Sequence, residues 1–87
     1  MRFWLWTVWL NAPTITPVQP QEQFGANLRG RRRAASLSQE QLADRSGFHF
    51  TEISRLERGV REPRLSTIVR LARALELSPA DLLDDIS

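Results

Sequence analysis

Residues 50–58 place a mixed set of polar side chains at helical spacing around two apolar residues. Ile53 and Leu56 stand three positions apart and mark the inner face of a short amphipathic helix. The positions left on the outer face are Phe50, Thr51, Glu52, Ser54, Arg55 and Arg58. An arginine guanidinium can donate two parallel hydrogen bonds to a guanine or to a phosphate, and threonine and glutamate can hydrogen bond to base edges. The outer face therefore has the side-chain chemistry of a nucleic-acid contact.

The charge along the chain is unevenly distributed, although the net charge is only +2. All twelve basic residues are arginines, and eleven of them lie in residues 21–75 against six acidic residues, a balance of +5. Residues 76–87 contain four acidic residues and no arginine, a balance of −4. A basic body with an acidic end predicts that one face of the domain meets a polyanion. A mixed-charge surface without such a partner is the competing interpretation.

The composition argues against an enzyme or a metalloprotein. The 87 residues include no cysteine, so neither a disulfide framework nor a thiolate metal site is available. His49 is the only histidine, so it has no second histidine for a metal cluster and no cysteine for a catalytic pair. We therefore expect no catalytic residues, no metal and no cofactor. A chain of this length is expected to form one small domain.

The helix at residues 50–57 is expected to follow a second short helix across a tight turn. The stretch LSQEQLADRSGFHFTEISRLERG at residues 37–59 predicts such a helix-turn-helix. Ser38 is a good N-cap for the first helix, and Gln41 stands where it can complete a capping box. Gly47 suits the left-handed conformation that ends this helix.

Three further helices are expected around this pair, at residues 21–35, from residue 66 and from residue 78. Ser66 and Ser78 are typical N-cap residues, and Pro79 suits the first position of the last helix. No segment alternates between apolar and polar residues with a period of two, so no sheet is expected. The sequence therefore predicts an all-α fold of five short helices.

The first twenty residues differ in composition from the rest. Residues 1–10 hold all three tryptophans but are too short to span a bilayer, and residues 11–20 contain three prolines. We expect residues 1–20 to be an extended, disordered or loosely packed appendage and residues 21–87 to be the folded domain. The alternatives are an aromatic anchor that packs on the domain or on a second subunit, and a short signal peptide.

The predicted helices resemble the Cro/C1-type (XRE) helix-turn-helix domain of bacterial and phage repressors. The resemblance covers residues 24–86. Its motifs are LSQEQLA at 37–43, Ser-Gly-Phe at 46–48, EISRLERG at 52–59, REPRLSTI at 61–68 and LARALEL at 71–77. It implies a compact five-helix bundle of the lambda-repressor-like DNA-binding type.

The resemblance also implies roles for individual residues on double-stranded DNA. The helix at residues 50–57 would lie in the major groove, where the base-reading residues are Phe50, Thr51, Arg55 and Glu52. The residues expected at the DNA backbone are Gln39, His49, Ser54, Arg58, Arg61 and Arg64. The competing interpretations are that Phe50 packs back onto the preceding helix, that Glu52 is a solvated acid, and that the arginines only face solvent.

The family pattern further implies a partly buried salt bridge between Arg32 and Glu57, which would make both residues structural. Two positions depart from the pattern. Arg31 occupies a position that is commonly apolar, so either its side chain reaches out to solvent or the helix is shifted. Ser36 replaces the glycine that commonly ends the first helix, which predicts a less tight or a strained turn.

These observations predict a cytoplasmic, sequence-specific transcriptional regulator, a repressor that occupies an operator. One recognition helix reads about 3–5 base pairs, too few to select a single site in a genome, so a homodimer on a palindrome is expected. Leu82, Leu83 and Ile86 are the expected dimer contacts, with closure of the core as the alternative. The rival functions are an antitoxin that binds a toxin through residues 1–20, and a restriction–modification controller.

Overall fold

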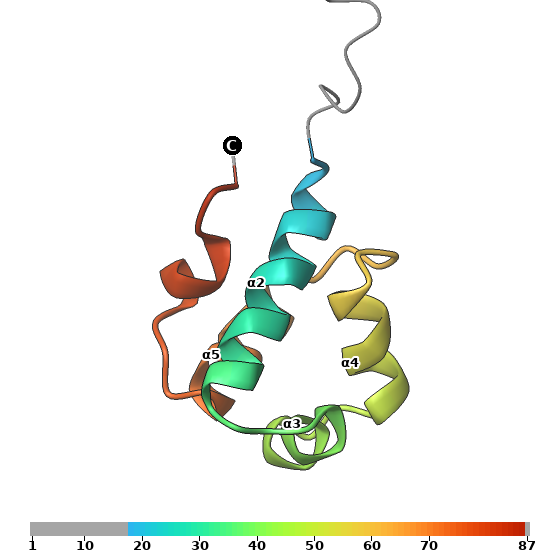
Figure 1. Cartoon of the computed structure of the whole chain (residues 1–87), viewed down its shortest axis with the longest axis vertical. Helices are drawn as coiled ribbons and strands as arrows, with labels where there is room; N and C mark the ends of the chain where they lie inside the picture. Colours follow the sequence, from blue (N-terminus) through green and yellow to red (C-terminus); the bar gives the residue numbers. More distant parts are fainter. Residues whose placement is uncertain (1–17, 87) are drawn as a thin grey trace, which may run out of the picture.

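The computed structural model describes residues 18–86, and the chain is all-helical over that range (Figure 1). The elements are α2 (Pro20–Ala34), α3 (Gln39–Ser46), α4 (Phe50–Glu57), α5 (Leu65–Ala74) and the 3-10 helix η1 (Pro79–Leu83). Among the described residues there is no strand, so the predicted all-α class is confirmed. The predictions made for residues 1–17 lie outside the described part of the chain.

The prediction of five α-helices was wrong at the C-terminal end, where the last helix is a 3-10 helix of five residues. Its start is as predicted, since Ser78 is the N-cap and forms a capping box with Asp81. Its end is set by α2: the Asn27 Nδ2 donates hydrogen bonds to the carbonyls of Leu82 (3.0 Å) and Asp84 (2.7 Å). The Leu82 carbonyl would accept from the amide four residues on in a continuing α-helix. The hydrogen bond from Asn27 to this carbonyl therefore favours a stop after five residues.

The other helix starts follow the predictions closely, with one exception. The α3 helix begins after the N-cap Ser38, and α4 has the predicted bounds. The exception is α5, where the N-cap is Arg64 and not Ser66. The Arg64 carbonyl already accepts the amide of Ile68 at 3.1 Å, so Ser66 lies inside the first helical turn. A cap contributes only about 1 kcal/mol, less than the burial of one large apolar side chain such as Ile68.

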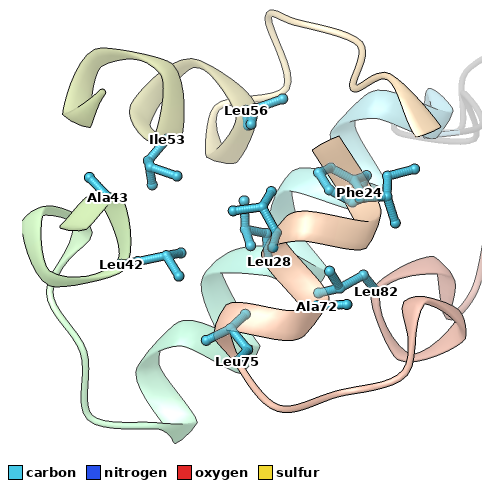
Figure 2. Packing of buried hydrophobic residues seen from close by; sticks show 11 residues of the cluster. Phe24, Leu28, Leu42, Ala43, Ile53, Leu56, Ala72, Leu75 and Leu82 are labelled. Carbon is cyan, nitrogen blue, oxygen red and sulfur yellow. The ribbon is translucent and has the colours of Figure 1, made fainter. Parts of the chain in front are cut away.

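Every element contributes to one hydrophobic core (Figure 2). Its members are Phe24, Leu28, Leu42, Ala43, Ile53, Leu56, Ile68, Leu71, Ala72, Leu75 and Leu82. The position of Leu82 corrects a prediction, because this side chain is 0% exposed within one chain and is not available as a dimer contact. The neighbouring Leu83 is 40% exposed, and Ile86 is half-buried and packs against the edge of the core.

The α2 and α4 helices approach closely because a glycine lies at their contact. A Cβ added at Gly25 would lie 2.5 Å from the Leu56 carbonyl oxygen and 2.6 Å from that of Glu57. Any larger residue at this position would push the two helices apart. The closeness matters for the site, because it brings side chains of α2 against the end of α4.

Ser36 and Arg31, the two residues that depart from the family pattern, are each accommodated by the local structure. Ser36 adopts the left-handed conformation with φ of 59°, so the turn after α2 keeps a glycine-like backbone in a residue that is strained there. Arg31 turns toward η1, where its Nη2 lies 3.9 Å from a carboxylate oxygen of Asp81 and 3.6 Å from one of Asp84. The acidic end of the chain therefore partly neutralises Arg31.

Candidate nucleic-acid interface

Contacts with α3 and with α5 hold the turn between α3 and α4. Gly47 has φ of 78° and donates its backbone amide to the Ala43 carbonyl at 2.9 Å, which ends α3. Arg70 of α5 donates to the Ser46 carbonyl from Nε (3.2 Å) and from Nη2 (3.0 Å). The same guanidinium lies 4.1 Å from the centre of the Phe48 ring, a cation–π contact. These contacts fix how α4 leaves the turn.

The sequence interpretation gave no role to Arg70. Its acceptor lies 24 residues away in the chain, and nothing in the local pattern of α5 marks this arginine as different from the other exposed residues of the helix. The available signal was indirect: Phe48 is a large aromatic residue in a polar turn, and such a residue needs a packing partner.

The α4 helix separates its apolar and polar residues as predicted. Ile53 and Leu56 are 0% exposed and pack in the core. On the outer face Phe50 is 48% exposed, and Thr51 and Arg55 are also exposed. About half of Phe50 is accessible, so a contact between Phe50 and DNA stays a prediction. Phe50, Thr51 and Arg55 therefore form an accessible surface on one short helix.

Two of the predicted outer residues are less accessible than the others. Glu52 and Ser54 are half-buried, because they lie at the borders between the outer face and the core. Glu52 also lines an open polar groove of about 350 Å³ between α4 and the start of α5. Arg61 and Arg64 line the same groove, and both are exposed. The groove therefore places two guanidinium groups beside the outer face of α4.

The ends of α4 carry the remaining predicted backbone contacts. His49 is the N-cap of α4, is exposed, and makes no side-chain capping hydrogen bond. Arg58 is the C-cap residue at the other end and is also exposed. Gln39 lies in the first turn of α3 and is half-buried. All ten predicted DNA-contact residues thus belong to α3, α4, the turn between these two helices, or the segment between α4 and α5.

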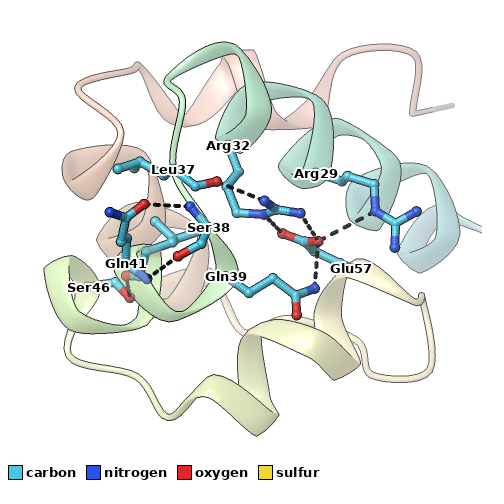
Figure 3. A network of polar contacts seen from close by, with 9 residues as sticks. Arg29, Arg32, Leu37, Ser38, Gln39, Gln41, Ser46 and Glu57 are labelled. Atoms are coloured by element: carbon cyan, nitrogen blue, oxygen red, sulfur yellow. Dashed lines mark hydrogen bonds and ion pairs between the residues drawn. The ribbon is translucent and has the colours of Figure 1, made fainter.

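The ion pair implied for Arg32 and Glu57 is formed at the junction of α2 and α4 (Figure 3). Arg32 donates from Nε to one carboxylate oxygen at 2.6 Å and from Nη2 to the other at 3.0 Å. Its third donor, Nη1, reaches the Leu37 carbonyl at 2.8 Å. The side chain of Glu57 is 0% exposed and that of Arg32 is 10% exposed. This is a buried, two-pronged salt bridge with an additional backbone contact.

Two more side chains bind the same carboxylate. Gln39 donates from Nε2 to the Oε1 of Glu57 at 2.9 Å, and the Nε of Arg29 lies 3.5 Å from the same oxygen. Neither contact was part of the sequence prediction. Gln39 is therefore held by Glu57 through one of its amide hydrogens, and a primary amide carries a second hydrogen and an oxygen for other contacts.

The network also determines the charge state of its members. Burial by itself raises the pKa of the Glu57 carboxyl. The hydrogen bonds from Arg32 and Gln39 and the charge of Arg32 outweigh that effect, and Arg29 adds to them, so the pKa lies below the ordinary value. The hydrogen bond to Glu57 likewise raises the pKa of Arg32. The pair is thus charged at neutral pH and stabilises the α2–α4 junction.

A short helix with an accessible polar face, held by a second helix and a tight turn, is a known arrangement. A family profile described as Helix-turn-helix (HTH_3) matches residues 28–82. The chain belongs to the helix-turn-helix family. The Cro/C1-type resemblance is confirmed by this match, and α4 is the second helix of the helix-turn-helix.

Similar helix-turn-helix proteins include two control proteins and one controller of known structure. Control protein C.SmaI of Serratia marcescens is 46% identical over 63 residues, which are 72% of this chain and 75% of the relative. Control protein C.BamHI of Bacillus amyloliquefaciens is 44% identical over 62 residues, 70% of this chain and 76% of the relative. The crystal structure of the restriction-modification controller protein C.AhdI from Aeromonas hydrophila has a TM-score of 0.70 at 42% identity, over 71% of this chain and 94% of that chain.

The helix-turn-helix chain is thus a DNA-binding transcriptional regulator. Among residues 18–86 no three histidines or carboxylates come together in a way that could hold a metal ion. No helix within the same residues has the length and hydropathy needed to cross a bilayer.

Proposed function

We propose that this regulator binds a palindromic operator as a homodimer and represses transcription by blocking access of the polymerase. The observation that carries the proposal is the outer face of α4, where Phe50, Thr51 and Arg55 are accessible around a fully buried inner face. A rigid helix with exposed donors is what the major groove admits.

The three exposed side chains would read bases in different ways. Arg55 can donate two hydrogen bonds to guanine O6 and N7, the strongest single discrimination available to this helix. Thr51 can hydrogen bond to a base edge or contact a thymine methyl, and Phe50 can only offer an apolar contact. The half-buried Glu52 would accept a hydrogen bond from a cytosine amino group where the major groove of the DNA brings one close.

The residues around α4 would hold the DNA backbone. Arg61 and Arg64 stand on the polar groove beside α4, and Arg58 and His49 lie at the two ends of the helix. Backbone contacts fix the register of a protein on the duplex without reading sequence. Gln39 and Ser54 would complete this set from α3 and from the border of α4.

The dimer contact is proposed at the surface formed by η1 and the segment after it. Leu83 and Ile86 border an open depression of about 510 Å³ whose lining also includes Phe24 and Ile68. A second copy of the chain would remove the exposed Leu83 from water. Leu82 has no part in this contact, because it belongs to the core.

A second candidate function is control of a restriction–modification system. It is supported by the similarity to C.SmaI, C.BamHI and C.AhdI, which extends over three quarters or more of each of these proteins. The alternative of an antitoxin has no comparable support, because none of these three relatives is described as one.

The proposal is tested by selecting binding sites from a pool of random double-stranded oligonucleotides with the full-length protein. A palindrome with half-sites about one helical turn apart is the expected result. Equal recovery of unrelated sequences would overturn the specific-regulator proposal. A reporter placed behind the selected site then distinguishes repression from the activation that a controller role would add.

A further inference from the structure

One carboxylate at the α2–α4 junction is surrounded by more positive charge than it can neutralise. Glu57 carries one negative charge, while Arg32 and Arg29 both contact it. The three side chains together therefore carry a net charge of +1, close to the first turn of α3. An excess charge next to the expected DNA-binding surface is available to a polyanion.

The excess charge is located on Arg29. Arg32 is buried and directs all three of its donor nitrogens to partners inside the protein. Arg29 contacts Glu57 only through Nε, at 3.5 Å, which is longer than a strong charged hydrogen bond. Its side chain is 46% exposed. The loss of this one contact would leave Glu57 still neutralised by Arg32.

Arg29 and Gln39 converge on a single atom. The Nε2 of Gln39 and the Nε of Arg29 both contact the Oε1 of Glu57, at 2.9 Å and 3.5 Å. The two donors come from different helices and meet at this one carboxylate oxygen (Figure 3). The two donor nitrogens are therefore no further apart than these two contacts laid end to end, a gap that one phosphate held between them can bridge with hydrogen bonds from its oxygens.

We propose that Arg29 binds the same DNA phosphate as Gln39, as an additional backbone contact contributed by α2. Glu57 is the shared acceptor that holds the two side chains together before DNA arrives. The inference rests on the proposed function, because it needs Gln39 to face the DNA backbone. It extends the DNA-binding surface from the helix-turn-helix to the preceding helix.

The test compares two arginines of α2 that are equal in charge. Arg29→Ala removes the proposed contact. Arg31→Ala is the matched control, because Arg31 lies about 200° further around the helix and faces Asp81 and Asp84 of η1. Binding to a duplex carrying the selected operator is measured between 50 and 200 mM salt. Thermal unfolding of each variant shows that the compared proteins are folded.

The slope of log affinity against log salt should become shallower by about 0.9 in Arg29→Ala, because one phosphate contact is lost. The loss of affinity across the fourfold salt range would then be about 3.5-fold smaller than in the wild type. Arg31→Ala should keep the wild-type slope. An unchanged slope in Arg29→Ala, or an equal change in both variants, would overturn the inference.

A double-substitution cycle tests whether the phosphate is shared. Gln39→Ala and Arg29→Ala should together weaken operator binding less than the product of their separate effects, because the second loss removes part of an already broken contact. Strictly multiplicative effects would place the two side chains on different phosphates and contradict the inference. Failure of the wild type to prefer any sequence would instead count against the proposed function, so the two failures are distinguishable.

Discussion

The α3 helix and η1 begin in the same way and end differently. Ser38 accepts the amide of Gln41, and the Gln41 side chain accepts the amide of Ser38. At η1 the corresponding residues, Ser78 and Asp81, also form a capping box. Yet α3 is an α-helix of eight residues, whereas η1 is a 3-10 helix of five. The capping residues decide where a helix begins, but they do not decide its length or its type.

The difference lies in the contacts at the C-terminal ends. The α3 helix ends on Gly47, and its last carbonyl is bound by Arg70 of α5. The η1 helix is stopped by Asn27, whose amide binds two carbonyls that follow the Ser78 cap. The α3 region is also tied to α4 through Gln39, while η1 contributes a single residue, Leu82, to the buried core. Substitutions should therefore act unequally in the two regions.

The largest expected effect is at the buried ion pair behind the helix-turn-helix. Glu57→Ala should lower the free energy of unfolding by about 3–5 kcal/mol, because Arg32 would be left buried without a charge partner. Chemical denaturation measures this loss. A loss below about 1 kcal/mol would mean that the pair behaves like a surface salt bridge. The ion pair would then give the helix-turn-helix no stability advantage over η1.

The same pair should make stability depend on pH. The pKa of Glu57 is lowered in the folded chain, so its stabilisation is complete above the unfolded value and is lost as pH falls through the folded value. Stability should therefore decrease below about pH 4.5, the ordinary value for this carboxyl. Denaturation of Glu57→Gln over the same pH range provides the control, and an identical acid decrease in that variant would assign the effect to other carboxyls.

The second largest effect is at Leu82, the one residue of η1 in the buried core. Leu82→Ala should cost about 2–5 kcal/mol, because it leaves a cavity in the core. Leu83→Ala, at the exposed neighbouring position, should change the stability of the monomer by only about 0.5 kcal/mol. Denaturation at several protein concentrations separates these roles. If Leu82→Ala altered only the concentration dependence, Leu82 would be a dimer contact after all.

The third effect separates the regions by function. Arg55→Ala should reduce discrimination at one base pair of each half-site by about 1–3 kcal/mol and leave the fold intact. Arg61→Ala should instead weaken binding to all sequences and lower the salt slope by about 1. Competition binding with operator variants measures both. Loss of affinity without loss of base preference in Arg55→Ala would reassign Arg55 to the backbone.

The smallest effect compares the two caps directly. Ser38→Ala should cost about 1 kcal/mol, because α3 depends on this cap to begin. Ser78→Ala should cost about 0.5 kcal/mol, the lower end for an N-cap, because Pro79 and Asn27 also hold η1 in place. Thermal unfolding of the two variants ranks them. A larger loss in Ser78→Ala would show that the cap, and not the contacts with α2, stabilises η1.

Much of the site could be predicted because it depends on short-range patterns. The outer face of α4 follows from the positions of Ile53 and Leu56 in an eight-residue helix, and exposure of Arg55 follows with it. The contacts of Gln39 and Arg70 could not be predicted in the same way. Both bind atoms on other helices, at separations of 18 and 24 residues, and no local periodicity reports such a partner.

The sequence by itself determined the all-α class, the start of α3 at Ser38 and the residues on each face of α4. These features depend on hydrogen bonds and side-chain spacings within about four residues, where chain geometry leaves few alternatives. Only the tertiary structure decided that η1 stops early and that Leu82 belongs to the core. The Asn27 contact that ends η1 spans 55 residues, so it exists only once α2 and η1 have packed together.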